Sequence, residues 1–218
     1  MIGCVEQGTK RNMSCNEYQV IDGVGIIPND EICVQSYGFV GCDDLVRVVI
    51  PNGISVIGES AFAWCSNLQS IKIPDSVLWI AADAFLYCES LRRIDIPKDV
   101  FQIDDGAFAC CVSLENIKIP QKLTMINDGL FSECRSLGSV VIPIGIKEIR
   151  DYAFSGCKSL KVVRFKGKET YVSENAFGDC DSLGKIIVPY GSKSFYKDWL
   201  SDELHSKIIE LPVADVCY

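Results

Sequence analysis

The sequence PDSVLWIAADAFLYCESLRRIDI, residues 74–96, holds one complete copy of the pattern that decides the fold. Its end has the form LxxIxI, with apolar residues at Leu91, Ile94 and Ile96. Arg93 comes directly before Ile94, and Asp95 stands between the two isoleucines. Successive side chains of a strand point to opposite faces. The pattern therefore predicts a short strand with its apolar residues inside and its charged residues outside.

The rest of this unit supplies a second set of inward residues. Pro97 follows the strand directly, and because proline offers no N–H to a ladder, the chain is expected to turn there. Val77 and Ile80 form another inward pair. A further inward set is Ala84, Phe85 and Cys88, whose spacing places them on one face of a short helical turn. Core contacts are therefore expected from both sides of the unit.

The same pattern recurs every 23 residues, which is the signature of a repeat architecture. A phenylalanine occupies one position in seven units: Phe39, Phe62, Phe85, Phe108, Phe131, Phe154 and Phe177. A cysteine follows three residues later in each: Cys42, Cys65, Cys88, Cys111, Cys134, Cys157 and Cys180. One unit cannot close its own core, whereas stacked units share one, with neighbouring strands about 4.8 Å apart.

The expected fold is an α/β repeat solenoid. It is a leucine-rich-repeat arc with parallel strands on the concave face and short helical turns and loops on the convex side. We expect an N-terminal cap at residues 1–27, seven repeats at 28–188 and a C-terminal cap at 189–218. In the first cap Asp22 and Gly25 replace the usual Leu and Ile. In the second, a short helix from about Ser194 presents an apolar face made of Phe195, Trp199 and Leu200.

Composition limits the partners that the chain can bind. Its 218 residues include 48% hydrophobic ones and its net charge is −8, which argues against nucleic acid and anionic lipid as general ligands. No run approaches the roughly 20 apolar residues of a membrane-spanning helix, and the first residues lack the pattern of a signal peptide. As written, the chain reads as cytoplasmic, but these features leave its localisation open. It is expected to be without membrane insertion and to be a monomer or weakly self-associating.

The twelve cysteines fall into two groups. The seven at the repeat position are expected to be small buried hydrophobes, because parallel stacked side chains suit disulfide geometry badly. The remaining five are candidates for exposed thiols or an occasional bridge: Cys4, Cys15, Cys33, Cys110 and Cys217.

No catalytic, cofactor or metal site is predicted. The sole histidine of the sequence, His205, lies in the expected C-terminal cap, far in sequence from most cysteines and serines. Nucleophilic catalysis needs a base within hydrogen-bond reach of the nucleophile. The sequence also has no phosphate-binding, dinucleotide-binding, zinc-protease or EF-hand motif. We therefore expect that the protein is not an enzyme.

Two surface features are candidates for partner binding. The outward strand positions carry one acid, Asp95, against six cations: Arg47, Lys72, Arg93, Lys118, Arg164 and Lys185. This strip can steer an acidic partner; alternatively, the cations only keep an exposed sheet soluble.

The second feature is a group of apolar residues where other units place polar ones. It consists of Leu78, Trp79, Phe101 and Met125. Exposed on successive coils, these side chains would form a protein interface. The alternative is that a cap or a neighbouring loop covers them.

The repeat resembles that of the BspA-like leucine-rich repeat family. The family pattern IP..V..I...AF..C..L..I.I is matched from Ile73 to Ile96, and the resemblance covers about residues 28–189. It implies a surface or secreted protein that binds host proteins or other cells. The predicted function is a non-enzymatic scaffold that binds a protein or other macromolecule through the concave strand face. The alternative is a structural or self-assembly module of a larger complex.

Overall fold

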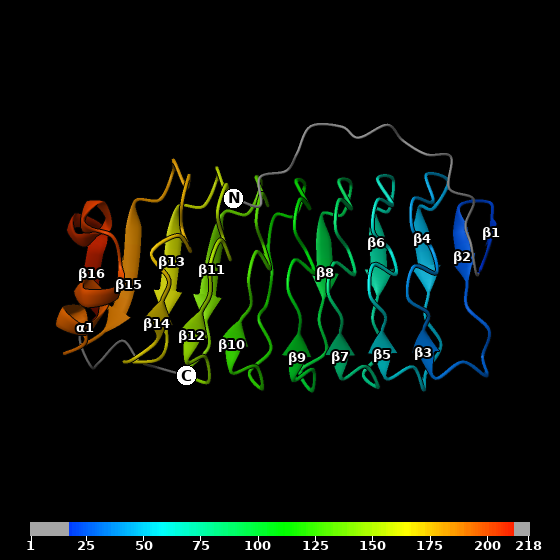
Figure 1. Cartoon of the computed structure of the whole chain (residues 1–218), viewed down its shortest axis with the longest axis horizontal. Coiled ribbons are helices and arrows are strands. Elements are labelled where there is room, and N and C mark those ends of the chain that lie inside the picture. The colour runs from blue at the N-terminus through cyan, green and yellow to red at the C-terminus, as the bar shows by residue number, and fades with distance from the viewer. Residues whose placement is uncertain (1–17, 212–218) are drawn as a thin grey trace.

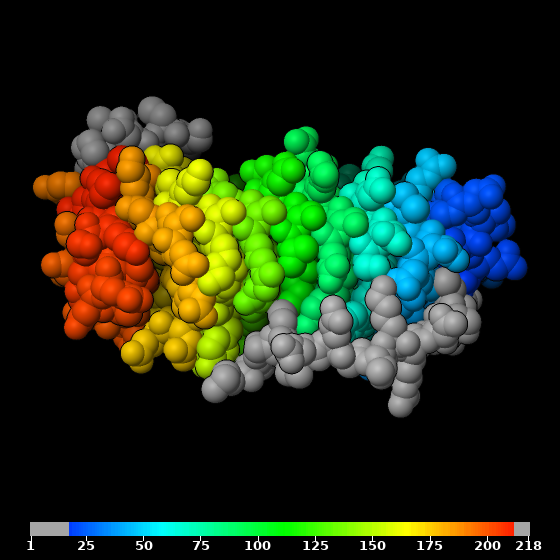
Figure 2. Space-filling model, turned by 90° about the horizontal axis from the view of Figure 1, so that it is seen from above, coloured from blue at the N-terminus to red at the C-terminus, as the bar shows by residue number. Residues whose placement is uncertain are grey.

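Each 23-residue unit forms one coil, and the coils lie side by side along a single long axis (Figure 1). The computed structural model describes residues 18–211. Figure 2 shows the coils as successive bands of colour from one end of the molecule to the other. Most coils contribute short strands at two places, which form two columns along the axis. The leucine-rich-repeat solenoid predicted from the period is confirmed.

The first strand column comes from the LxxIxI motif. In the repeats it consists of β4 (Arg47–Val49), β6 (Ser70–Lys72), β8 (Arg93–Asp95), β11 (Ser139–Ile142), β13 (Val162–Phe165) and β15 (Lys185–Pro189). These strands pair in parallel, in a register that places Ile71 opposite Ile94, one repeat later. As predicted, Leu91, Ile94 and Ile96 are buried, and Arg93 and Asp95 are exposed.

Three further strands extend this column, two at the start and one at the far end. At the start, β1 (Gln19–Ile21) pairs antiparallel with β2 (Val24–Ile26), which pairs parallel with β4. At the far end, β16 (Ile208–Leu211) pairs parallel with β15. Gly25 occupies an inward position of β2, where a Cβ atom would lie 2.8 Å from the ring of Phe39 and 2.9 Å from Leu45. The side chains of Phe39 and Leu45 therefore fill the space beneath β2, and they fit because Gly25 has no side chain.

The second strand column follows each turn at the end of the first. It consists of β3 (Cys33–Val34), β5 (Val56–Ile57), β7 (Trp79–Ile80), β9 (Gln102–Ile103), β10 (Met125–Ile126), β12 (Glu148–Ile149) and β14 (Tyr171–Val172). Both columns are interrupted near the middle. No ladder of the described strands joins β9 to β10, and β8 is linked to the following coil by one bridge, Arg93 to Asn116.

The helical turns expected around each phenylalanine are minor. Within residues 18–211 the helices are α1 (Lys193–Trp199) and the 3-10 helix η1 (Asp202–Lys207). The segment around Phe85 is a series of hydrogen-bonded turns that places Asp83 (φ 55°) and Tyr87 (φ 58°) in the left-handed region. Their N–H groups donate to the carbonyls of Asp105 and Ala109 in the next coil, both at 3.0 Å. Hydrogen bonds between coils thus hold a conformation that these residue types seldom adopt.

The phenylalanines form a continuous ladder through the core. Their rings stack with centroids 5.2 to 5.7 Å apart from Phe39 to Phe177. Tyr18 extends the ladder by stacking on Phe39 at 4.9 Å, and its hydroxyl accepts a hydrogen bond from the Gln35 N–H. Tyr18 can cover the apolar end of the stack because its hydroxyl, although partly buried, keeps a hydrogen-bond partner.

The C-terminal helix covers the other end, with one difference from the sequence prediction. The residue of α1 that is buried is Tyr196, whose hydroxyl donates to the Gly167 carbonyl at 2.7 Å. Leu200 is buried and Phe195 packs partly against the core. Trp199 was predicted on the buried face, but it is 43% exposed and lies edge-on to Tyr171. The prediction for Trp199 was wrong because Tyr196 occupies the space above the last coil.

Candidate functional site

The six cations predicted from the strand pattern lie on the outer surface of the first strand column, and we call them the cationic face. Arg47, Lys72, Arg93, Arg164 and Lys185 are outward residues of β4, β6, β8, β13 and β15. Lys118 lies in the coil that has no strand here. Five of the six are exposed and Arg164 is half-buried.

The register separates these charges from one another. Arg47 and Arg93 both lie opposite Ser70. Lys72 lies between Val49 and Asp95, and Arg164 lies between Val141 and Ile187. Like charges directly opposite one another would destabilise the sheet. The alternation therefore lets the column carry several cations at low cost.

Few carboxylates neutralise the cationic face. Among the ion pairs of residues 18–211, the face contributes one, between Arg93 and Glu115 at the limiting distance of 4.0 Å. Both side chains are well exposed, so the pair is weak. Exposed aliphatic residues lie between the cations, notably Val49 (63%) and Val141 (47%). A mixture of cationic and aliphatic side chains suits a protein surface better than a phosphate backbone.

The second group of predicted residues lies on the outer surface of the second strand column. Leu78 and Phe101 are consecutive along the axis, joined by a main-chain hydrogen bond of 3.1 Å. Leu78, Trp79 and Phe101 are 40%, 37% and 53% exposed, so no cap or loop within residues 18–211 buries them. Trp79 is also held in place, because its indole N–H donates to the Asp104 carboxylate at 2.7 Å. Their part in binding stays a prediction.

Met125 is separated from this group by the interruption between β9 and β10. In other coils, the main-chain N–H of the residue equivalent to Asn127 donates to a carbonyl of the preceding coil. The N–H of Ala81 donates to the Ile57 carbonyl, and the N–H of Arg150 donates to the Ile126 carbonyl, both at 2.9 Å. At the interruption the side-chain amide of Asn127 makes this bond instead, to the Ile103 carbonyl at 2.7 Å. A side chain therefore spans a gap that the main chain closes elsewhere.

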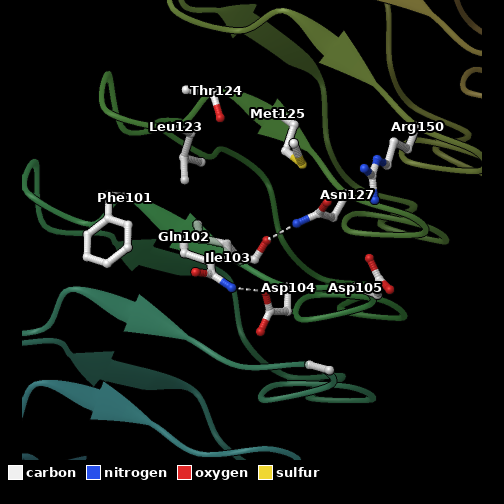
Figure 3. A pocket seen from close by; sticks show the side chains of 11 residues that line it. Phe101, Gln102, Ile103, Asp104, Asp105, Leu123, Thr124, Met125, Asn127 and Arg150 are labelled. Carbon is white, nitrogen blue, oxygen red and sulfur yellow. Dashed lines mark hydrogen bonds between the residues drawn. The ribbon is translucent and has the colours of Figure 1, made fainter.

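The gap is a cavity of about 660 Å³, which we call the β9–β10 slot. One wall is formed by residues 101–105 and the other by Leu123, Thr124, Met125 and Asn127. In Figure 3, Phe101 and Leu123 lie at one end, whereas Asp105 and Arg150 lie at the other. Sequence analysis identified Phe101 and Met125 but missed the acidic, amide and arginine residues of the slot.

The cysteines at the repeat position, which we call the cysteine column, include free thiols whose ionisation is opposed by burial. Six thiols lie one per coil, and each donates to a phenylalanine carbonyl of the preceding coil at 2.9 to 3.3 Å. Burial raises the pKa of Cys65, Cys111 and Cys180 to about 12. Burial likewise raises the pKa of Cys88, Cys134 and Cys157 well above 9.0. Because the thiolate is the nucleophile, these side chains are unsuited to catalysis.

Two cysteines differ from their neighbours. Cys42 belongs to the column and is buried as expected, but it is disulfide-bonded rather than free. Cys110, predicted as an exposed thiol or a bridge, is buried and disulfide-bonded. Cys33 is a half-buried free thiol. Predictions for Cys4, Cys15 and Cys217 concern positions outside the described residues.

The described residues supply no constellation typical of an enzyme or a metal centre. The His205 ring contacts the Leu200 carbonyl at 2.9 Å and lies 3.6 Å from Asp202, so its partners belong to the C-terminal cap. Within 18–211 no three His, Cys, Asp or Glu side chains gather as metal ligands. No helix in this range is long and apolar enough to span a bilayer.

Comparison with known families agrees with the repeat geometry. The model of the BspA type leucine-rich repeat region matches residues 32–161 and 127–214, with six copies. The chain belongs to the BspA-type leucine-rich repeat family. A search of curated proteins found no match.

Several solved structures are similar to this chain. The leucine-rich repeat protein of Treponema pallidum is 29% identical, with a TM-score of 0.67 over 81% of this chain and 83% of that one. The pneumococcal vaccine antigen PcpA is 23% identical, with a TM-score of 0.55 over 88% of this chain and 42% of that one. A leucine-rich cell surface protein of Faecalibacterium prausnitzii is 20% identical, with a TM-score of 0.46 over 78% and 80%.

The residues that sequence analysis missed had a weak signal. Asn127 shares its column with Gly58, Ala81, Asp104, Arg150 and Ser173, so its size alone gives no signal. Leu130 is the departure, because it is a larger side chain where most units have alanine. Comparison of columns, rather than of whole repeats, would have indicated an irregular coil at this place.

Proposed function

We propose that this BspA-type repeat protein is a non-enzymatic scaffold that binds an acidic protein partner through the cationic face. The observation that carries the proposal is the concentration of exposed, largely unpaired cations on one strand column of a chain whose net charge is −8. Charge complementarity of this kind steers association and selects partners. Exposed Val49 and Val141 would add apolar contact area between the charges.

Membership of the family supports a role in recognition. Leucine-rich-repeat solenoids present an extended, regular surface on which one side chain per coil can contact a partner. The resemblance to BspA-like proteins favours a location at the cell surface or in the surrounding medium, where adhesion to another cell or to a host protein would take place.

A second candidate function is assembly with copies of the same chain. The exposed group of Leu78, Trp79 and Phe101 favours it, since apolar side chains on consecutive coils can mediate self-association. In that case the cations of the first column only maintain solubility. Light scattering over a range of protein concentrations distinguishes the two, because assembly predicts a mass that rises with concentration.

The test is affinity capture with three baits. The first is the chain itself, and the second carries Arg93→Glu, Lys118→Glu and Arg164→Glu on the cationic face. The matched control, which has the same change in charge away from this face, carries exchanges at three exposed lysines: Lys98→Glu, Lys147→Glu and Lys168→Glu. Extracts of the source cell and extracellular proteins of a host are compared.

We expect an acidic protein to be retained by the first and third baits and lost from the second. Retention by all three would show that the cationic face does not carry binding. Capture of nothing but copies of the chain, by all baits, would favour assembly.

A further inference from the structure

We propose that the β9–β10 slot binds an extended, basic segment of a partner protein. An apolar side chain of that segment would lie against Phe101 and Met125, and a lysine or arginine would lie against Asp104 and Asp105. The slot is on the second strand column and its charge is opposite to that of the cationic face. The inference therefore does not depend on the function proposed for the cationic face.

The slot is a built feature rather than a loose contact between coils. Asn127 is buried, and its amide spans the gap to the Ile103 carbonyl at 2.7 Å. On either side the coils pair normally, β9 with β7 and β10 with β12. Among residues 18–211, no main-chain hydrogen bond joins 101–103 to 124–126. Strand edges with free main-chain groups are templates for an added extended segment.

The two ends of the slot differ in chemistry. Phe101 is 53% exposed and lies with Leu123 at one end of the slot, while Met125 lies between this end and Asn127 in Figure 3. The far end contains Asp104 and Asp105. Residues 101 to 105 of an extended chain span about 13 Å, at roughly 3.3 Å per residue. That length, with a cavity of about 660 Å³, accommodates a short extended segment.

The charge of the far end is negative. Asp104 accepts hydrogen bonds from Trp79 and from Gln102, and Asp105 accepts one from the Asp128 N–H. These bonds orient the carboxylates without neutralising them, and no ion pair of the described residues includes either one.

One nearby group opposes this field and others add to it. Arg150 is the cation at this end of the slot, and its charge is partly offset by Glu148, 3.7 Å away. The pKa of Asp83, in the adjoining coil, is raised by burial first and then by the charges of Glu59 and Asp105. Carboxylates therefore act on one another at this edge of the solenoid, and a cationic side chain from a partner would relieve their repulsion.

The experiment is selection from a phage-displayed library of random heptapeptides against the full chain. A parallel selection uses the Asp104→Asn/Asp105→Asn variant, which removes two charges and keeps the size of the side chains. The matched control is Glu169→Gln/Glu174→Gln, which also removes two charges from exposed acids. Glu174 is in the same repeat column as Asp105, three coils away. Thermal unfolding of all three proteins establishes that each is folded.

We expect enriched peptides to contain a lysine or arginine within a few residues of an aromatic or aliphatic residue. The affinity of the most enriched peptide should fall at least tenfold with the double variant and change less than twofold with the control, since the double variant removes both carboxylates that a lysine or arginine would contact. Hydrogen exchange should show protection by that peptide at residues 101–105 and 123–127.

Three results would overturn the proposal. They are the absence of enrichment over the double variant, enrichment of acidic peptides, and protection confined to the first strand column. The last two would instead indicate binding at the cationic face, so failure of this inference is distinguishable from failure of the proposed function.

Discussion

Replacement of Cys111 by alanine should destabilise the protein at pH 7 and have almost no effect at pH 10. Cys111 is fully buried between coils, and its thiol donates to the Phe85 carbonyl at 3.3 Å. Loss of that bond and of the buried sulfur is expected to cost about 1 to 2 kcal/mol at pH 7. Phe85 keeps a second donor, the N–H of Cys88, so its carbonyl is not left unpaired.

The effect of pH follows from the shift in the thiol pKa. Burial raises the pKa of Cys111 from 9.0 to about 12. Below pH 9 the thiol is neutral in both the folded and the unfolded chain. Above pH 9 the unfolded chain loses the proton and the folded chain keeps it, so stability falls as the pH rises towards 12. At pH 10 this linkage costs about 1.4 kcal/mol for one thiol, and the alanine variant does not bear that cost.

The assay is urea unfolding of both proteins at pH 7 and pH 10, with a phosphine reductant that prevents new disulfides. The reductant opens the disulfides of Cys42 and Cys110 in both proteins alike. Other titrating groups are common to both proteins and cancel in the difference. Val112→Ala is the control, because it alters a neighbouring side chain that does not titrate, and its cost should be equal at the two pH values. A Cys111→Ala cost that stays constant between pH 7 and pH 10 would refute the reasoning, since it would mean that the folded thiol ionises normally.

Three further predictions concern the core, the thiols and the slot. Phe108→Ala should cost about 4 to 5 kcal/mol and Phe177→Ala about 3 kcal/mol in urea unfolding, because Phe108 stacks on two rings and Phe177 on one; equal costs would count against the ladder. A thiol-alkylating reagent should label Cys33 well before the six free column cysteines, as mass spectrometry of the native protein would report; rapid labelling of the column would disprove its burial. Asn127→Ala should lower stability by about 1 to 3 kcal/mol, because the Ile103 carbonyl loses its partner; an unchanged melting temperature would mean that the amide is not the bridge.

The parts of the fold that could be predicted are those fixed by periodicity. Residues such as Leu91 and Ile94 face inward because the alternation of a strand leaves no other arrangement, and the 23-residue repeat makes every coil bury the same columns. The exposure of Arg93 and Trp79 followed from the same argument. A pattern repeated seven times predicts the side on which a residue lies better than any local propensity.

Turn conformation and strand pairing could not be predicted in this way. Trp64 and Tyr87 adopt positive φ angles, against the preference of bulky residues, because their N–H groups bond to the next coil. The β16 strand, outside the repeat, depends on the packing of α1 before it. The slot depends on a side-chain contact between two coils, in which the Asn127 amide donates to the Ile103 carbonyl. Each of these features is set by contacts between coils, which the pattern within one repeat does not describe.

The most direct test of the account is the affinity of the captured partner, once purified, for three forms of the chain. These are the parent, the Arg93→Glu/Lys118→Glu/Arg164→Glu variant and the Lys98→Glu/Lys147→Glu/Lys168→Glu control. We predict that Kd rises at least tenfold for the first variant, stays within twofold for the control, and depends on salt most strongly for the parent and control. Equal affinities for all three forms would contradict the claim that the cationic face is the binding surface.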